Sequence, residues 1–447
     1  MNLVSFSIKT KGIRNFSRRL WTVFTRFGFS EARISRALHT LVETLGKYDA
    51  APTFFIPAVV LQRHVALIHE ITGAGAEMGV HGYIHNDYRY LSEVGQYKQM
   101  EQAVAVFEST HTPFNGFRNP YLGWTEDTLR VLTALGFAYE SNEAVLHPVI
   151  DLDLLTPSLR SGYEKSFELF QALACNAYVL RPHVEESLLR IPTSIPDDEM
   201  LFDRLRITDA QEVGRIWRKI MERVYDLGGI YTLNLHPERA LLCRRALDIL
   251  LSFASSQALP VWLPRLNEVA QWHQERRQFK LEIVEESPRR WRFAATCSSR
   301  ATLLARHLTL EDQAASPWFG PDVRVLEQSG VVSADRCPCI ALSAQTPQEV
   351  LEFLQEQGYP ALRCAPEEGQ RYALYLDLPG GLGDTREEQR ARRGSLLEQL
   401  VQLEAPLLYF GYWPDGCRAA LAVSGDIDSI TAQDFFLRVF EVSKHAD

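Results

Sequence analysis

The sequence contains no hydrophobic run that approaches the roughly 20 residues a helix needs to cross a bilayer, so it predicts no membrane-spanning segment. Cysteine is also sparse: the seven cysteines are scattered, and only Cys337 and Cys339 stand close together. Their C-P-C spacing is tighter than the C-x-x-C of metal and redox motifs, which favours free buried thiols. The start shows no secretory pattern either, and together these features predict a reducing, cytoplasmic compartment.

Residues 1–30 contain no aspartate or glutamate, although the chain as a whole is acidic, with a net charge of −9. That overall balance excludes nucleic acid as the main partner, because phosphate binding needs a basic surface. The acid-free segment interleaves lysines and arginines with Phe16, Trp21, Phe24 and Phe27. Such a basic amphipathic helix either lies on an anionic membrane surface or packs on the domain with its arginines in water. Peripheral membrane contact is therefore one hypothesis for this segment.

A length of 447 residues predicts two or three domains. From about residue 30 to 270, short apolar runs alternate with helical patterns such as 32–45 and 126–135, which indicates βα units around a parallel sheet or barrel. The expected strands lie near residues 55, 139, 191 and 262, and others end at His81, Arg118 and His236. Because the carboxyl ends of barrel strands carry the active site, we expect these last three side chains at one mouth.

A charged stretch around Lys280 marks a boundary, and the residues after it mix strand-like runs with helices. This pattern predicts a small α+β accessory domain. The later run A-L-A-V-S-G-D-I-D-S predicts a buried strand, and Thr431 is well placed to cap a helix that follows it. The predicted division is a barrel over 1–275, an accessory domain over 280–410, and a strand-helix unit over 412–447 that returns to the barrel.

Two histidines four residues apart, His81 and His85, stand in G-V-H-G-Y-I-H at an expected strand end. Neutral imidazole is a common ligand of zinc-like ions, and an aspartate or glutamate oxygen usually completes the set. The H-x-x-x-H spacing alone is a weak signal, since most such pairs bind no metal. Two further motifs follow it: R-N-P-Y, with Arg118 and Tyr121, and L-N-L-H-P, with His236.

Taken in order, these three motifs resemble the polysaccharide deacetylase (NodB-homology) family, carbohydrate esterase family four, over about residues 30–270 and the tail from 412. T-F-F-I-P-A also resembles the strand before the family's histidine motif. The resemblance implies an α/β fold of the incomplete (β/α) barrel type. It implies an enzyme that removes an N-acetyl or related acyl group from an N-acylated carbohydrate or lipid-linked sugar. It also implies one divalent ion, zinc or alternatively cobalt, nickel or manganese.

The resemblance assigns roles to individual residues. It implies that His81 and His85 bind the ion. Arg118 would orient the catalytic base through a bidentate contact, and the backbone N–H of Tyr121 would help to stabilise the oxyanion.

His236 would protonate the leaving group as a general acid. The family's further acidic residue has a looser match in I-P-T-S-I-P-D-D-E, where Asp198 or Asp197 would tune the histidine or arginine. The alternative is a solvated acidic turn. Trp124 would line a sugar subsite or belong to the core.

The family's first motif, an acidic pair at the end of the first strand, is missing from its expected place. The N-terminal strand L-V-S-F-S-I-K-T-K-G offers Lys9 and Lys11 instead. Lysine cannot replace a carboxylate ligand, and its charge repels a cation. Taken alone, this strand predicts a catalytically inactive carbohydrate-binding or regulatory protein on the same fold.

The tail offers a replacement, because Asp426 and Asp428 form a D-x-D whose carboxylates share one face of a strand. We therefore predict a permuted arrangement in which the C-terminal strand closes the barrel. Asp428 would be the third metal ligand, and Asp426 the base that deprotonates a metal-bound water. Two alternatives remain: the aspartates cap the following helix, or they begin a truncated second deacetylase domain.

Overall fold

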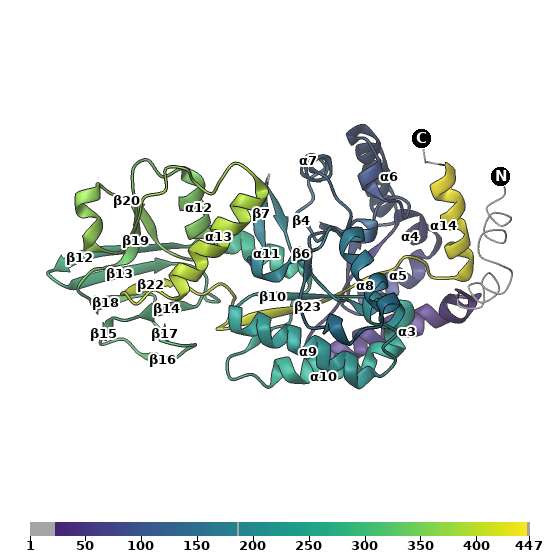
Figure 1. The fold of residues 1–447 in the computed structure, drawn as a ribbon, viewed down its shortest axis with the longest axis horizontal. Coiled ribbons are helices and arrows are strands. Elements are labelled where there is room, and N and C mark those ends of the chain that lie inside the picture. Colours follow the sequence, from purple (N-terminus) through teal and green to yellow (C-terminus); the bar gives the residue numbers. More distant parts are fainter. Residues whose placement is uncertain (1–22, 186, 445–447) are drawn as a thin grey trace.

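The computed structural model, which describes residues 23–185 and 187–444, contains one large sheet whose central strands are short and buried on both faces (Figure 1). Burial on both faces is typical of parallel strands that helices cover. The strands of this sheet are β1 (Thr53–Ile56), β2 (Glu77–Val80), β3 (Gly116–Phe117), β4 (Tyr139–Glu140), β5 (Ala144–Leu146), β6 (Leu173–Ala174), β7 (His183–Glu185), β8 (Leu188–Arg190), β9 (Thr193–Ile195), β10 (Ile230–Leu235), β11 (Val261–Trp262) and β23 (Ala419–Asp426).

The sheet curls into an incomplete barrel through a continuous set of pairings. β4 pairs with β8. The next strand after each of these, β5 and β9, pair with each other, and β9 also pairs with β10. If β4 with β5 and β8 with β9 each count as one position, the described strands around the barrel occupy seven positions (β1, β2, β3, β4/β5, β8/β9, β10 and β23). A complete (β/α) barrel has one more. The predicted α/β fold, an incomplete barrel closed by a C-terminal strand, is confirmed.

β23 fills the position between β1 and β10 and is parallel to both. In Figure 1 it is the yellow strand beside β10. The strand is buried along its whole length, and its apolar residues explain why it enters the sheet. At its end the chains approach so closely that a β-carbon on Gly425 would lie 2.7 Å from the backbone oxygen of Leu235. β23 is thus a strand of this barrel, not the start of a separate sheet.

Helices cover the outer face of the sheet, and their apolar stripes face it. In α9, for example, Val213, Trp217, Ile220 and Val224 are buried at the three- and four-residue spacing of one helix face. The helices of this part are α3 (Ala32–Gly46), α4 (Ala58–Arg63), α5 (Val65–Gly73), α6 (Glu93–Ser109), α7 (Glu126–Ala134), α8 (Pro157–Leu169), α9 (Ala210–Leu227), α10 (Ala240–Ser255), α11 (Leu266–Arg276) and α14 (Ala432–Lys444). The helices expected over 32–45 and 126–135 are α3 and α7.

The strands between α11 and β23 belong to three small sheets, ordered β12-β13-β18-β15, β16-β17-β14-β22 and β20-β19-β21. The predicted mixture of strand-like runs and helices is present here, with α12 (Gln348–Glu356) and α13 (Arg386–Val401) among its helices. The strands are β12 (Lys280–Ser287), β13 (Arg290–Thr296), β14 (Leu303–Arg306), β15 (Thr309–Glu311), β16 (Ala315–Pro317), β17 (Asp322–Val325), β18 (Ser329–Ser333), β19 (Cys337–Leu342), β20 (Ala361–Arg363), β21 (Tyr372–Leu376) and β22 (Leu407–Phe410). The domain boundaries themselves stay a prediction.

Cys337 and Cys339, on β19, are free and buried, with 3.3 Å between their sulfur atoms. The basic segment is described only from residue 23. There, Phe24 and Phe27 pack against Phe436 and Phe435 of α14, at ring-centroid distances of 5.9 and 5.6 Å. Phe16, Trp21 and the strand with Lys9 and Lys11 lie outside the described residues, and membrane contact stays a prediction. None of the helices within 23–185 and 187–444 combines the length and the apolar character that a membrane span requires.

The helix after β23 starts with Thr431 as its cap, as predicted. The backbone N–H and hydroxyl of Thr431 donate to Asp434 at 2.9 and 2.8 Å, and the N–H of Asp434 donates back to the Thr431 hydroxyl. Asp426 and Asp428 do not fill this capping position. The alternative that they serve as the helix cap is therefore wrong.

α14 is held on the barrel by His64, at the junction of α4 and α5. Its Nδ1 lies 2.5 Å from Glu31 and its Nε2 lies 2.8 Å from Asp434, so both ring nitrogens face carboxylates. Burial opposes the charge on His64, but the hydrogen bonds and negative charges of Asp434 and Glu31 outweigh it and raise the pKa of His64. The two carboxylates therefore favour the imidazolium form of this ring, which joins the start of α3 and the α4–α5 junction to α14.

Replacing His64 with glutamine should lower the thermal midpoint by a few degrees at about pH 6 and by much less at about pH 9. The folded pKa is raised above 6.5, so the stabilisation is full below that value and is lost as the pH rises through the raised pKa. Calorimetry at both pH values checks this. His69→Gln is the control, because Nε2 of His69 faces the Thr110 backbone oxygen and the Thr112 hydroxyl instead of carboxylates. Equal destabilisation by His64→Gln at both pH values would contradict an imidazolium.

Candidate functional site

The candidate site lies where β1, β2 and β23 end. Phe55 of β1 pairs with Asp426, the last residue of β23, and Val80 of β2 pairs with Ile56. His81 follows directly, its backbone N–H bonded to the oxygen of Ile56. Because parallel strands present their carboxyl ends at one edge, the histidine motif and the D-x-D motif meet here.

Three side chains converge as a metal-ligand set. Oδ1 of Asp428 lies 3.6 Å from Nε2 of His81 and 3.2 Å from Nε2 of His85. Atoms that coordinate one ion at ~2.1 Å in a tetrahedral arrangement are about 3.4 Å apart. The spacing, the two imidazoles and the single carboxylate therefore fit a zinc-like divalent ion.

The orientation of the histidines also fits an ion. Nδ1 of His81 lies 2.8 Å from the backbone oxygen of Arg118, so this nitrogen donates and Nε2 keeps its lone pair for a ligand bond. Nδ1 of His85 is buried and has no hydrogen-bond partner among the described residues. Burial lowers the pKa of His85, which favours the neutral, metal-binding form.

The second oxygen of Asp428 faces another way. Oδ2 accepts a hydrogen bond from Nη1 of Arg438, on α14, at 3.1 Å. Burial opposes ionisation of Asp428, but the neighbouring histidines and the charge of Arg438 outweigh it and hold its pKa well below the usual range. Asp428 is therefore a carboxylate with its two oxygens directed to different partners.

Asp426 is fixed by two residues of the barrel interior. Nη1 of Arg118 donates to Oδ1 at 3.2 Å, and the side-chain amide of Asn234 donates to Oδ2 at 2.8 Å. The contact from Arg118 uses this one nitrogen instead of the bidentate contact expected from the sequence. Nη1 also donates to Ser424 and Asn234, while Nε and Nη2 donate to Ser141 and Thr193. A fully buried guanidinium thus holds β9, β10, β23 and the β4–β5 connection together with the carboxylate.

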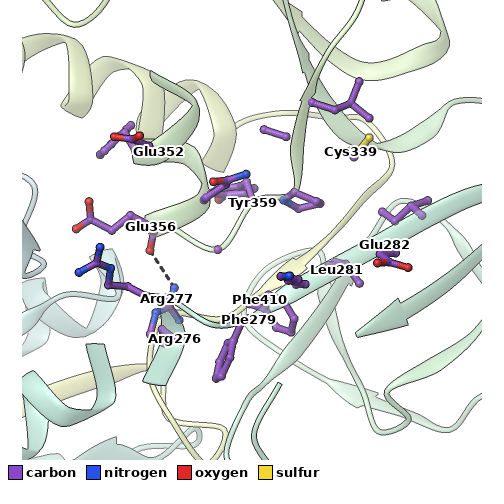
Figure 2. A pocket seen from close by; sticks show the side chains of 18 of the residues that line it. Arg276, Arg277, Phe279, Leu281, Glu282, Cys339, Glu352, Glu356, Tyr359 and Phe410 are labelled. Carbon is purple, nitrogen blue, oxygen red and sulfur yellow. Dashed lines mark hydrogen bonds between the residues drawn. The ribbon is translucent and has the colours of Figure 1, made fainter. Parts of the chain in front are cut away.

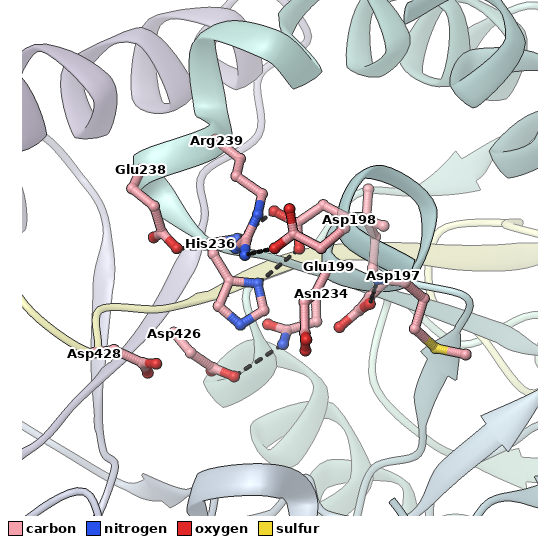
Figure 3. Close-up of polar contacts among 12 residues, drawn as sticks. Asp197, Asp198, Glu199, Asn234, His236, Glu238, Arg239, Asp426 and Asp428 are labelled. Atoms are coloured by element: carbon pink, nitrogen blue, oxygen red, sulfur yellow. Dashed lines mark hydrogen bonds and ion pairs between the residues drawn. The ribbon is translucent and has the colours of Figure 1, made fainter. Parts of the chain in front are cut away.

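His236 follows β10 and is paired with Asp198, as Figure 3 shows. Nδ1 of His236 lies 2.6 Å from one Asp198 oxygen, and its backbone N–H donates to the other at 2.7 Å. Burial opposes the charge on His236, but Asp198 outweighs it and raises the pKa of His236 well above the usual range. Nδ1 is therefore committed to Asp198, and Nε2 carries the proton that can be donated.

Of the two aspartates considered, Asp198 is the one that contacts His236. Asp197 instead accepts the backbone N–H of Met200, and burial together with the charge of Asp198 raises its pKa. Both carboxylates are almost fully buried, so the solvated acidic turn is the wrong interpretation.

Tyr121 lies beside the metal-ligand set with a strained backbone. Its φ of 60° is in the left-handed region, which a non-glycine residue adopts at a cost. The ring is 41% exposed and meets His85 edge-on, with 4.9 Å between ring centroids. The role of its N–H in stabilising an oxyanion stays a prediction.

Sequence reasoning missed Asn234 and Arg438. Asn234 stands two residues before His236, and strand alternation could have placed it on the same face. Arg438 gave no such signal, because its contact with Asp428 depends on how α14 docks. Elsewhere, Glu238 and Arg239 form a local ion pair at 2.9 Å, and Trp124 stacks against Arg190.

A cavity of about 940 Å³ lies away from these residues, between α11 and the sheets of the accessory region (Figure 2). Arg276, Phe279, Cys339, Glu356 and Tyr359 are among its lining residues. The buried guanidinium of Arg276 is satisfied by backbone oxygens, including that of Glu356. None of the predicted site residues lines this cavity.

Comparison with known proteins covers the site residues that lie before residue 140. The polysaccharide deacetylase family model matches residues 31–139, which include His81, His85, Arg118 and Tyr121. The peptidoglycan deacetylase-like protein FGM2 of Gibberella zeae is 31% identical over 91 residues, or 20% of this chain. The chain covers only 27% of the length of that relative.

Solved structures of similar proteins include a probable polysaccharide deacetylase from Pseudomonas aeruginosa PAO1 and the PuuE allantoinase. Both are 20% identical with a TM-score of 0.41; the matches cover 55% and 53% of this chain, and 75% and 72% of theirs. A family-four carbohydrate esterase pseudoenzyme from Bacillus anthracis is 13% identical, with a TM-score of 0.25 over 42% of this chain and 57% of its own.

The family match and the curated relative agree with the motifs around His81 and Arg118, and the curled sheet agrees with the fold that those motifs imply. Residues 31–139 therefore match the polysaccharide deacetylase family.

Proposed function

We propose that this protein is a metal-dependent deacetylase that removes an N-acetyl or related acyl group from a sugar or lipid-linked sugar. The observation that carries the proposal is the convergence of Asp428 with His81 and His85, at 3.6 and 3.2 Å. The N-terminal strand expected from the sequence lacks the acidic pair of the family's site. In the permuted arrangement that we propose, Asp426 and Asp428 take its place. This supports an enzyme over an inactive binding protein.

His81, His85 and Asp428 would hold the ion. A divalent ion there supplies Lewis acidity toward an acyl oxygen and makes a water more acidic. Zinc suits the two-imidazole, one-carboxylate set best, with cobalt, nickel and manganese as alternatives.

Asp426 would act as the general base. Arg118 and Asn234 each hold one of its oxygens, so the carboxylate cannot rotate away from the ligand set. A fixed carboxylate can take a proton from a water that attacks the acyl carbon. The buried charge of Arg118 then faces the negative charge that develops beside it.

His236 would act as the general acid. The leaving amine or alcohol needs a proton as the bond to the acyl carbon breaks, and an imidazolium can donate one from Nε2. Asp198 keeps the ring protonated and fixes its tautomer. The N–H of Tyr121, on its strained loop, would stabilise the oxyanion.

The metal-ligand set is tested by Asp428→Ala and His81→Ala. The wild type should carry about one zinc ion per chain, and each substitution should lower the affinity at least ~100-fold because a ligand atom is lost. Elemental analysis and competition with a chromogenic chelator measure this, with His69→Ala as the histidine control. Full metal retention in Asp428→Ala would defeat the permuted site. A wild type without metal, and without esterase activity after zinc or cobalt addition, would favour the binding protein.

The base is tested by Asp426→Asn, which keeps the hydrogen bond from Arg118 but removes the basic oxygen. We expect metal content to stay and kcat to fall about 10²–10⁴-fold. Turnover of a small acetyl ester and metal content are measured on the same preparation. Unchanged turnover would show that another group takes the proton.

The acid is tested by Asp198→Asn. Loss of the carboxylate lowers the pKa of His236, so the fall of activity with rising pH should begin at a lower pH than in the wild type. The pH profile of kcat/KM and the titration of the His236 ring by NMR both report this. Asp197→Asn, which leaves the bond to His236 in place, should shift the profile less. An identical profile in Asp198→Asn would remove His236 from the acid role.

A further inference from the structure

The last helix supplies a polar contact to the metal-ligand set that no family motif contains. Arg438, on α14, donates from Nη1 to Oδ2 of Asp428 at 3.1 Å, while Oδ1 of the same carboxylate faces His81 and His85. The side chain of Arg438 is 22% exposed, and its guanidinium also lies 4.9 Å from the centre of the Phe435 ring. The arginine is therefore held in place and is not a free surface charge.

We propose that Arg438 is a positioning residue that keeps Oδ2 of Asp428 away from the ion, so that Asp428 binds through Oδ1 alone. This rests on the proposed function, since it concerns how the ligand set holds its ion. Carboxylates bind divalent ions through one oxygen or two, and two-oxygen binding fills a position that a catalytic site must keep open. A charge-assisted hydrogen bond to Oδ2 competes directly with the second bond.

The position of Arg438 is set by the contacts one turn earlier on α14. Asp434 stands four residues before it, on the same helix face. Asp434 is bound by His64 at 2.8 Å and by Arg63 at 3.1 Å. The barrel thus fixes the rotation of the helix, and that rotation directs Arg438 at Asp428.

The charge of Arg438 determines in which direction metal affinity should change when the residue is removed. A guanidinium next to the ligand set repels a divalent cation, so it weakens binding while it orients the carboxylate. The usual partner of a ligand has the opposite effect, because its loss weakens metal binding. Removal of Arg438 should therefore leave metal affinity equal or higher and still impair turnover.

The test compares Arg438→Met and Arg438→Lys in the full chain. Arg438→Met keeps the length of the stem but has no donor, and we expect zinc affinity equal to the wild type or up to about tenfold tighter. In the cobalt-substituted protein, the visible absorption should weaken, because a two-oxygen Asp428 raises the coordination number. On an acetyl ester, kcat should fall about tenfold or more at unchanged KM. Arg438→Lys retains a charged donor and should restore part of the spectrum and of kcat.

Arg63→Met is the matched control, since it removes another arginine that anchors α14 without touching Asp428. It should lower the thermal midpoint and leave the cobalt spectrum unchanged, because His64 still holds Asp434 and the helix rotation. The same spectrum in Arg438→Met and wild type would overturn the proposal, and so would a rise in KM alone, which would make Arg438 a substrate contact. A spectral change in Arg63→Met equal to that in Arg438→Met would reduce its role to helix docking. A wild type that binds no metal would overturn the proposed function itself.

Discussion

The parallel pairing of β23 with β1 on one side and β10 on the other is the constraint on which the rest of the structure depends. The register of these pairs places Asp426 opposite Phe55 and sets Gly425 against Leu235. A shift of one residue would turn both aspartates to the outer face, because side chains alternate along a strand. The buried strand and the close approach at Gly425 hold this register, and through it the ligand set is formed.

Arg118 converts this register into a fixed site. Its guanidinium is fully buried and bonds to residues on three strands and on the β4–β5 connection, so it requires a negative partner inside the barrel. Asp426 is that partner. The Arg118–Asp426 ion pair therefore neutralises the buried charge of the guanidinium and also orients the carboxylate that we propose as the base. Both the packing of the barrel interior and the proposed chemistry depend on this pair.

Local patterns were enough to predict most of the barrel strands, α3, α7 and the ends where His81, Arg118 and His236 lie, because apolar periodicity and strand ends are local properties of the sequence. The place of Asp428 was predictable only through resemblance, since the acidic pair had to replace Lys9 and Lys11. Contacts that depend on docking were not predictable. Arg438 reaches Asp428 only because Asp434 and His64 fix a helix, and Arg118 distributes its donors over Ser141 and Thr193, which no motif marks.

The late position of β23 has a consequence for how the molecule folds. Arg118 and Asp426 are 308 residues apart in sequence, so the site is built from contacts of very high sequence separation. Closing such a loop carries an entropic cost before any contact repays it, which slows folding. Until β23 inserts, β1 and β10 each present an unpaired backbone edge, which invites pairing with other chains. Insertion of the strand that completes the site therefore also pairs these two edges and removes them as templates for other chains.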